Sequence, residues 1–273
     1  MFSPVILPKA GSNPPPKSHE ASRYIRHLSL PGFGEDQQVR LRKSDILVIG
    51  AGGLGAPAIT YLAAAGVGCL RIVDDDVVET SNLARQVLFD AGDVGRSKAE
   101  AAANRVSRLN PDVQVVPINE RFTSETAPDL LKEATVVLDC SDNLPTRYTI
   151  QRAAMAAGIP CVWAAVGQFW GHCSVVLPDE GACFECIFGP EELVNGWPTA
   201  RQAGMFSPVC GVMGALAAGE AIKVITGVGE PLVNRMALAD TATGELGCLP
   251  VVPDPGCSTH KAYSPATAAS SRI

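Results

Sequence analysis

The stretch DILVIGAGGLGAPAITYLAAAGVGCLRIVDDD, residues 45–76, decides the fold. An apolar run leads into the glycine-rich turn GAGGLG (50–55), an alanine-rich segment follows, and a second apolar run ends in three aspartates. This order predicts a buried strand, a phosphate-binding turn, a helix and a second strand. The GxGxxG glycines are Gly50, Gly52 and Gly55. Asp74 follows about 20 residues on, where a ribose-binding carboxylate is expected, so the motif alone fits either NAD or ATP.

The rest of the chain continues this alternation. We expect strands at 45–49, 70–74, 114–118, 135–139 and 161–165, separated by helices at 53–65, 97–109, 125–133 and 144–157. Consecutive βαβ units require a parallel sheet with helices on both faces, and they place ligands at the carboxyl ends of the strands. Antiparallel segments at 173–177 and 236–239, a polar stretch at 189–208 and a buried helix at 212–226 follow. The predicted fold class is α/β and Rossmann-like, a mostly parallel sheet with an antiparallel C-terminal extension.

Composition places the chain among globular proteins. Its 273 residues are 47% hydrophobic, which is enough for a sizeable core. The net charge of −6, without a Lys/Arg-rich block, disfavours nucleic acid as a partner. Two uncharged stretches, 46–70 and 202–219, are long enough to span a bilayer, but their glycines and prolines favour buried elements of a parallel α/β protein. No signal-peptide pattern is evident, so we expect a cytoplasmic protein without a membrane partner.

Three segments differ in composition. We expect a flexible proline-rich leader at 1–20, a single domain at 21–262 and a flexible tail at 263–273. The nine cysteines are odd in number and several stand in apolar runs, where a thiol behaves as a small hydrophobic group. They do not indicate a disulfide framework.

Charged residues after the second and fourth strands favour ATP over a dinucleotide. Asn82, Arg85 and Lys98 lie between the second strand and the next helix. A dehydrogenase needs few cations there, because the helix N-terminus serves the pyrophosphate, whereas a triphosphate under attack needs fixed cations or Mg²⁺. Asp142 follows the fourth strand, and a carboxylate beside phosphates is repulsive unless it holds a metal ion. The predicted ligand is therefore MgATP.

Five spaced motifs extend this pattern: RYIRH (23–27), GAGGLG (50–55), DDDVVETSNLARQ (74–86), GRSKA (95–99) and CSDN (140–143). Together they resemble the E1-type activating enzymes of the MoeB/ThiF/HesA family, over nearly the whole chain from Arg23 to His260. The resemblance implies a homodimeric adenylyltransferase. Its substrate would be the C-terminal glycine carboxylate of a small ubiquitin-like sulfur-carrier protein ending in Gly-Gly.

The resemblance also implies a role for each matching residue. Gly53 would lie at the phosphates beside the other glycines of the turn, and Asp74 would bind the ribose. Asn82, Arg85 and Lys98 would contact the triphosphate, Asp142 would hold Mg²⁺, and Asn143 is its neighbour. Arg26 of RYIRH matches an arginine that reaches the phosphates from the other subunit, although an ordinary surface arginine is an alternative for this position.

The chemistry that these residues serve needs no general base. A peptide carboxylate is already ionised near neutral pH, and its oxygen attacks the α-phosphorus of ATP to give an acyl adenylate. Catalysis then consists mostly of alignment and charge neutralisation, which suits a site of cations, glycine amides and one metal ion.

Two pairs of potential metal ligands share a two-residue gap. Cys183 and Cys186 form a CxxC, and Cys257 and His260 follow near the C-terminus. Three thiolates and one imidazole can close a tetrahedron around Zn²⁺, and no open ligand position remains, so we expect a small structural zinc site. The family usually shows four cysteines here. The alternatives are a redox CxxC, disfavoured because it does not open a helix of a thioredoxin-like βαβ unit, and surface residues without a metal.

Some members of the family carry a further cysteine that bonds covalently to the activated carrier. The matching position in TARQAG (199–204) is Ala200, and the nearest thiol, Cys210, is expected in the core. We therefore expect the reaction to end at the acyl adenylate, with sulfur supplied by a separate donor protein and no rhodanese domain. The pathway stays open between molybdopterin, thiamin, cysteine and a secondary metabolite.

Other functions fit parts of the pattern. The same fold could adenylate another carboxylate, at a peptide terminus or on a modified tRNA base, and the acidic charge disfavours the tRNA. An NAD-dependent dehydrogenase is disfavoured by Arg85, Lys98 and Asp142. A non-catalytic subunit is disfavoured because every expected nucleotide residue is present.

Overall fold

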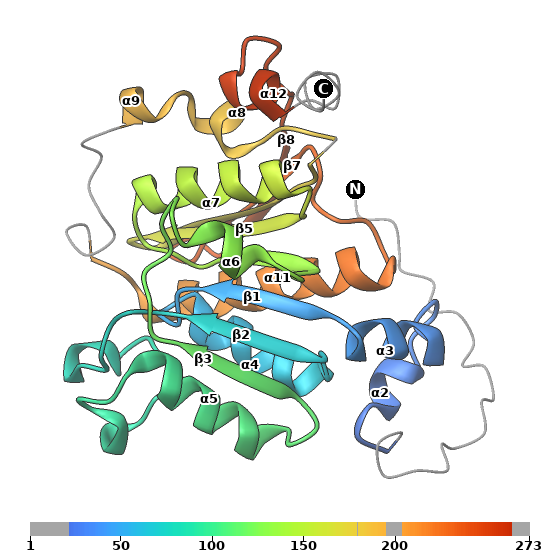
Figure 1. Ribbon diagram of the computed structural model, residues 1–273, viewed down its shortest axis with the longest axis vertical. Coiled ribbons are helices and arrows are strands. Elements are labelled where there is room, and N and C mark those ends of the chain that lie inside the picture. Colours follow the sequence, from blue (N-terminus) through green and yellow to red (C-terminus); the bar gives the residue numbers. More distant parts are fainter. Residues whose placement is uncertain (1–21, 179, 195–203, 264–273) are drawn as a thin grey trace.

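The computed structural model describes residues 22–178, 180–194 and 204–263. Its centre is an eight-stranded sheet in the order β3-β2-β1-β4-β5-β6-β7-β8 (Figure 1). The strands are β1 (Asp45–Ile49), β2 (Cys69–Val73), β3 (Gln114–Ile118), β4 (Val136–Asp139), β5 (Cys161–Gly167), β6 (Trp170–Val176), β7 (Arg235–Asp240) and β8 (Glu245–Pro250). The expected leader, Ala200 and the tail beyond Tyr263 lie outside the described residues.

The sheet changes direction at β5. Strands β1 to β5 pair in parallel, whereas β6, β7 and β8 follow in antiparallel pairs. The crossover of the chain from β3 to β4 places β1 in the middle of the parallel half, which is the arrangement of a Rossmann-like sheet. The predicted fold class, a mostly parallel α/β sheet with an antiparallel C-terminal extension, is confirmed.

Helices cover both faces of the sheet (Figure 1). They are α2 (Ile25–Leu28), α3 (Glu35–Arg42), α4 (Gly55–Ala65), α5 (Lys98–Leu109), α6 (Ala127–Leu131), α7 (Leu144–Ala157), α8 (Phe184–Phe188), α9 (Glu191–Val194), α11 (Ser207–Thr226) and α12 (Ser258–Tyr263). Alternate residues of β1 belong to two separate cores. Ile46 and Val48 pack with α4, α5 and α11, and Leu47 and Ile49 pack with α6 and α7.

Helix α11 accounts for one of the long uncharged stretches. Among the described residues it is the one helix long and apolar enough to cross a membrane, and half of its most apolar window is buried in the protein. It packs against α4, β5 and β6. The first stretch, 46–70, forms β1, the glycine turn, α4 and the start of β2.

Several elements differ from the sequence prediction, and three of the differences have a clear physical reason. Helix α11 begins at Ser207 rather than Val212, because Pro208 stands in its first turn, where a missing backbone N–H costs nothing. Helix α4 begins at Gly55, two residues later than expected, because Gly53 belongs to the turn. Strand β8 was not predicted, since all six of its residues are exposed and its sequence has no alternation to reveal it.

Candidate functional site

The glycine turn brings backbone close to the end of the neighbouring strand. Gly50 has φ +94°, and a Cβ at this position would lie 2.8 Å from the carbonyl oxygen of Cys140, which follows β4. A Cβ on Gly55 would collide with the carbonyl of Gly50. Both positions therefore require glycine, and the turn directs the N-terminus of α4 toward the carboxyl ends of the strands.

Asp74 follows β2 directly and is fixed beside this turn. Its Oδ2 accepts a hydrogen bond from the backbone N–H of Ala51 at 2.7 Å, and its Oδ1 accepts one from Asp76 at 3.0 Å. Burial raises the pKa of Asp74, while these backbone donors and the nearby Lys98 act in the opposite direction. The carboxylate is thus preorganised at the position where the sequence predicts a ribose ligand.

A cavity of about 1330 Å³ opens at the carboxyl ends of the parallel strands. Nine residues predicted from the sequence line it: Gly50, Gly52, Gly53, Asp74, Asn82, Arg85, Lys98, Asp142 and Asn143. Gly55 is buried beneath the turn. These residues come from four separate segments, and the sheet brings them to one edge as expected.

The two predicted cations of the cavity are held by short contacts. Lys98 is buried at the start of α5, and its Nζ lies 2.8 Å from Oδ2 of the exposed Asp76. The Nη1 of Arg85 donates to the carbonyl of Ser81 at 3.1 Å. The Oδ1 of Asn82 accepts from the backbone of Glu79 at 3.1 Å, which fixes the turn that carries Arg85. Two cationic side chains therefore line the cavity, and Lys98 lies close enough to Asp74 to affect its pKa.

Asp142 is exposed and also lines the cavity. It stands immediately before Asn143, whose Oδ1 caps α7 by accepting from the backbone of Thr146 at 3.0 Å. The Nδ2 of Asn143 donates to Oδ1 of Asp142 at 3.4 Å. The structure thus gives Asn143 a capping role, which the sequence prediction did not include.

A buried ion pair supports the loop that carries Asp142. Nη1 of Arg147 lies 3.3 Å from Oδ2 of Asp139, and Nη2 of Arg147 donates to the carbonyl of Ser141. Ser141 donates to Oδ1 of Asp139 from its backbone at 2.9 Å and from its hydroxyl at 2.6 Å. Sequence reasoning missed this network. A signal was present in VVLD, because an aspartate at the end of a fully apolar strand needs buried partners.

Gln86 also faces the cavity. It is 2% exposed, and no hydrogen-bond partner of its Oε1 lies among the described residues. A buried amide oxygen without a partner is costly, so it is ready to accept a hydrogen bond from a bound molecule or water.

Arg26 lies outside the cavity of its own chain. It is exposed on α2, which packs against α3, and α3 ends two residues before β1 begins. Figure 1 shows α2 and α3 together at this end of β1. Since the cavity is at the opposite, carboxyl end of the strand, Arg26 cannot reach it within one chain.

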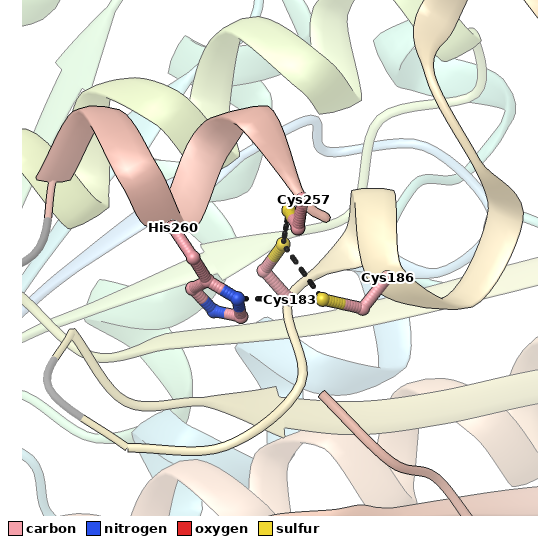
Figure 2. Close-up of side chains that lie close together, drawn as sticks. All are labelled: Cys183, Cys186, Cys257 and His260. Carbon is pink, nitrogen blue, oxygen red and sulfur yellow. Dashed lines mark hydrogen bonds between the residues drawn. The ribbon is translucent and has the colours of Figure 1, made fainter. Parts of the chain in front are cut away.

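The four predicted metal ligands converge where α8 meets α12 (Figure 2). Cys183 Sγ lies 3.5 Å from Cys257 Sγ and 3.7 Å from Cys186 Sγ, and Cys186 Sγ lies 3.4 Å from Nδ1 of His260. All four ligand atoms lie within 4.8 Å of one another. A Zn–S distance of about 2.3 Å places the corners of a tetrahedron about 3.8 Å apart. The donor set and its spacing therefore fit Zn²⁺.

The alternatives for this Cys/His cluster fit less well. Cys183 does precede a short helix, α8, but that helix follows the antiparallel β6 rather than standing in a βαβ unit. Cys183 and Cys257 are buried, so they are not surface residues. Burial raises the pKa of both thiols, which favours neutral groups unless a cation stabilises the thiolates.

A carboxylate between the cysteines joins the two halves of the cluster. Glu185 accepts hydrogen bonds from the backbone and hydroxyl of Ser258, at 3.0 and 2.6 Å, and from the hydroxyl of Thr259 at 2.6 Å. Burial alone raises the pKa of Glu185, but these donors and Arg152 outweigh it and lower the pKa. The backbone of Asp254 donates to Cys186 Sγ at 3.3 Å.

Cys210 is buried, as the sequence predicts. Its Sγ lies 2.9 Å from Sδ of Met205, and burial raises its pKa to about 11. A thiol in this state is a poor nucleophile near neutral pH.

Comparison with known proteins finds relatives over most of the described chain. The chain matches the ThiF family over residues 24–259. It is 41% identical over 243 residues to the sulfur carrier protein adenylyltransferase of Thermus thermophilus, covering 87% of this chain and 90% of that protein. It is 39% identical over 236 residues to the sulfur carrier protein ThiS adenylyltransferase of Escherichia coli, covering 86% and 93%. The crystal structure of E. coli MccB with ATP superposes with a TM-score of 0.78 at 24% identity, over 93% of this chain and 76% of that one, which shows a shared fold.

Proposed function

Because the chain belongs to the ThiF family, we propose that it is an adenylyltransferase that uses ATP to activate the C-terminal glycine carboxylate of a ubiquitin-like sulfur-carrier protein. The observation that carries this proposal is the cavity, in which a glycine turn, two cations and a carboxylate meet at one sheet edge. Two relatives of nearly equal length are named for this activity on a sulfur carrier.

The cavity residues predicted from the sequence each have a place in this reaction. Asp74 binds the ribose hydroxyls, and the amides of the glycine turn approach the phosphates. Lys98 and Arg85 neutralise charge on the triphosphate oxygens as the carrier carboxylate attacks the α-phosphorus and pyrophosphate leaves. Asp76 forms an ion pair with Lys98, and a bound phosphate would compete for the same ammonium group.

Two metal ions complete the proposal. Asp142 would hold Mg²⁺, which would neutralise phosphate charge when bound. Cys183, Cys186, Cys257 and His260 would hold Zn²⁺ in a structural role, supported by the ligand spacing.

The assembly is also part of the proposal. We infer a homodimer in which Arg26 reaches the cavity of the partner subunit, since its place on α2 leaves it unable to reach its own. A separate donor protein would supply sulfur after the acyl adenylate forms, and the cytoplasm is the expected location.

Pyrophosphate exchange tests this function. Labelled pyrophosphate should enter ATP only in the presence of a small ubiquitin-fold protein that ends in Gly-Gly. The same carrier without its two terminal glycines serves as the matched control. Exchange that persists without any carrier, or that is absent with every Gly-Gly carrier supplied, would contradict the proposal.

A further inference from the structure

Helix α7 touches both the cavity and the Cys/His cluster. Its first turn is capped by Asn143 at the cavity. About one and two turns further on, Tyr148 and Arg152 contact the segment that leads from the cluster through α8 to α9. Figure 1 shows α8 and α12 lying above α7, with α9 at the end of the same segment. The helix is therefore in contact with both regions at once.

Arg152 joins two carboxylates of that segment. Its Nη1 lies 2.8 Å from Oε2 of Glu191 in α9, and its Nη2 lies 3.9 Å from Oε2 of Glu185 in the cluster. Its guanidinium stands 5.3 Å from the ring centroid of Tyr148, and the hydroxyl of Tyr148 donates to the carbonyl of Gly189 at 2.6 Å. These contacts fix the residues between the cluster and α9 against α7.

The Glu185 end of this connection depends on the cluster. Glu185 lies between Cys183 and Cys186, and its carboxylate binds Ser258 and Thr259, which lie between the other two metal ligands. The side chain of Glu185 is 6% exposed. When the four ligands are held by one ion, this carboxylate has a fixed position, and Arg152 has a fixed second partner.

The Glu191 end forms part of the cavity wall. Glu191, Glu192 and Val194 all line the cavity. Helix α9 has four residues, and a helix that short is not stable without tertiary contacts. Among the described residues, α9 forms its ion pair with Arg152 of α7.

We propose that Arg152 is a positioning residue that couples order in the Cys/His cluster to the α9 wall of the cavity. Loss of the metal ion frees Glu185, leaves Arg152 with Glu191 as its one carboxylate partner and loosens α9. Loss of Arg152 loosens α9 while the cluster keeps its metal. Occupancy of the cluster therefore controls one wall of the binding cavity, not only the stability of the fold. The coupling rests on the proposed zinc, and its effect on substrate rests on the proposed function.

Hydrogen exchange followed by mass spectrometry tests the coupling without any activity assay. The proteins are wild type, Arg152→Met and the matched control Arg105→Met, which removes an exposed arginine from α5. Zinc content is measured for each. We expect Arg152→Met to retain zinc and the protection of residues 257–260, and to exchange about fivefold faster at 189–194, as the loss of one partly buried ion pair implies. In wild type, chelation should increase exchange in both regions.

Several results would overturn the proposal. The proposal fails if Arg152→Met exchanges at 189–194 as slowly as wild type. It also fails if chelation leaves the exchange of wild type at 189–194 unchanged, or if that exchange is already complete at the first time point. Zinc loss in Arg152→Met would show a structural role for the arginine in the cluster instead.

Steady-state kinetics of pyrophosphate exchange distinguish a failure of this proposal from a failure of the proposed function. In pyrophosphate exchange, Arg152→Met should raise KM for the carrier by about fivefold with a smaller change in kcat, and Arg152→Lys should recover part of the loss. An increase confined to kcat would contradict the positioning role. If wild type shows no exchange with any carrier, the proposed function fails, while the hydrogen-exchange result still decides the coupling.

Discussion

Replacing Arg147 with methionine should destabilise the fold through the loop that carries Asp142. The change leaves the Asp139 carboxylate 3% exposed and without its cation. Removing one member of a buried ion pair costs about 3–5 kcal/mol. Both hydrogen bonds from Ser141 to Asp139 remain, so we expect the lower end, about 3 kcal/mol, and a fall in Tm of roughly 6–12 °C.

Urea unfolding followed by circular dichroism measures this cost. Arg105→Met on α5 is the control, and it should change the free energy of unfolding by less than about 0.5 kcal/mol. The double variant Asp139→Asn/Arg147→Met removes the unpaired charge and should lose at least about 1 kcal/mol less than the sum of the single variants. A loss below about 1 kcal/mol for Arg147→Met, or strict additivity in the double variant, would refute the reasoning.

Three further predictions concern the turn and the two metal sites. Gly50→Ala should cost about 1–2 kcal/mol and weaken ATP binding measured by calorimetry, because φ is +94° and the new Cβ meets the Cys140 carbonyl; unchanged stability would contradict this. His260→Ala should lower the zinc content of protein prepared without chelators and increase its sensitivity to proteolysis. If wild-type protein prepared in the same way contains no bound zinc, the proposed metal site is contradicted. Asp142→Ala should reduce pyrophosphate exchange about 10²-fold and raise the Mg²⁺ concentration needed for half-maximal rate, whereas an unchanged Mg²⁺ requirement would assign the metal elsewhere.

The parallel half of the sheet could be predicted because its strands are short apolar runs, and most of them end at or next to a glycine or an aspartate. Strand β3 and helix α7 have the bounds that the sequence predicts. The hydrophobic pattern places each strand end, and parallel topology then brings Asp74, Lys98 and Asp142 to one edge.

The antiparallel half was less predictable. Strand β8 is exposed along its whole length, and α8 and α9 have five and four residues, too few for a helical period to appear. The positions of α8 and α9 depend on tertiary contacts from Tyr148 and Arg152 of α7, which lie more than 30 residues away from them in the sequence. The pairing of CxxC with Cys257 and His260 could still be predicted, because metal chemistry constrains ligand type and number.

The role of Arg26 depends on a second copy of the chain. Its exposed position on α2, which packs against α3, fits both a contact in trans and an ordinary surface arginine. A motif in one chain carries information about the partner only through family resemblance, so this role stays a prediction.

The central claim is that the terminal glycine of a carrier becomes an acyl adenylate in this cavity. The most direct measurement is intact-mass spectrometry of a Gly-Gly carrier after incubation with enzyme, ATP, Mg²⁺ and hydroxylamine. Hydroxylamine attacks the acyl adenylate, releases AMP and leaves a hydroxamate on the terminal glycine. We predict that hydroxamate with wild type and its near absence with Lys98→Met. A carrier that stays unmodified with wild type, or is modified equally by both enzymes, would contradict the account.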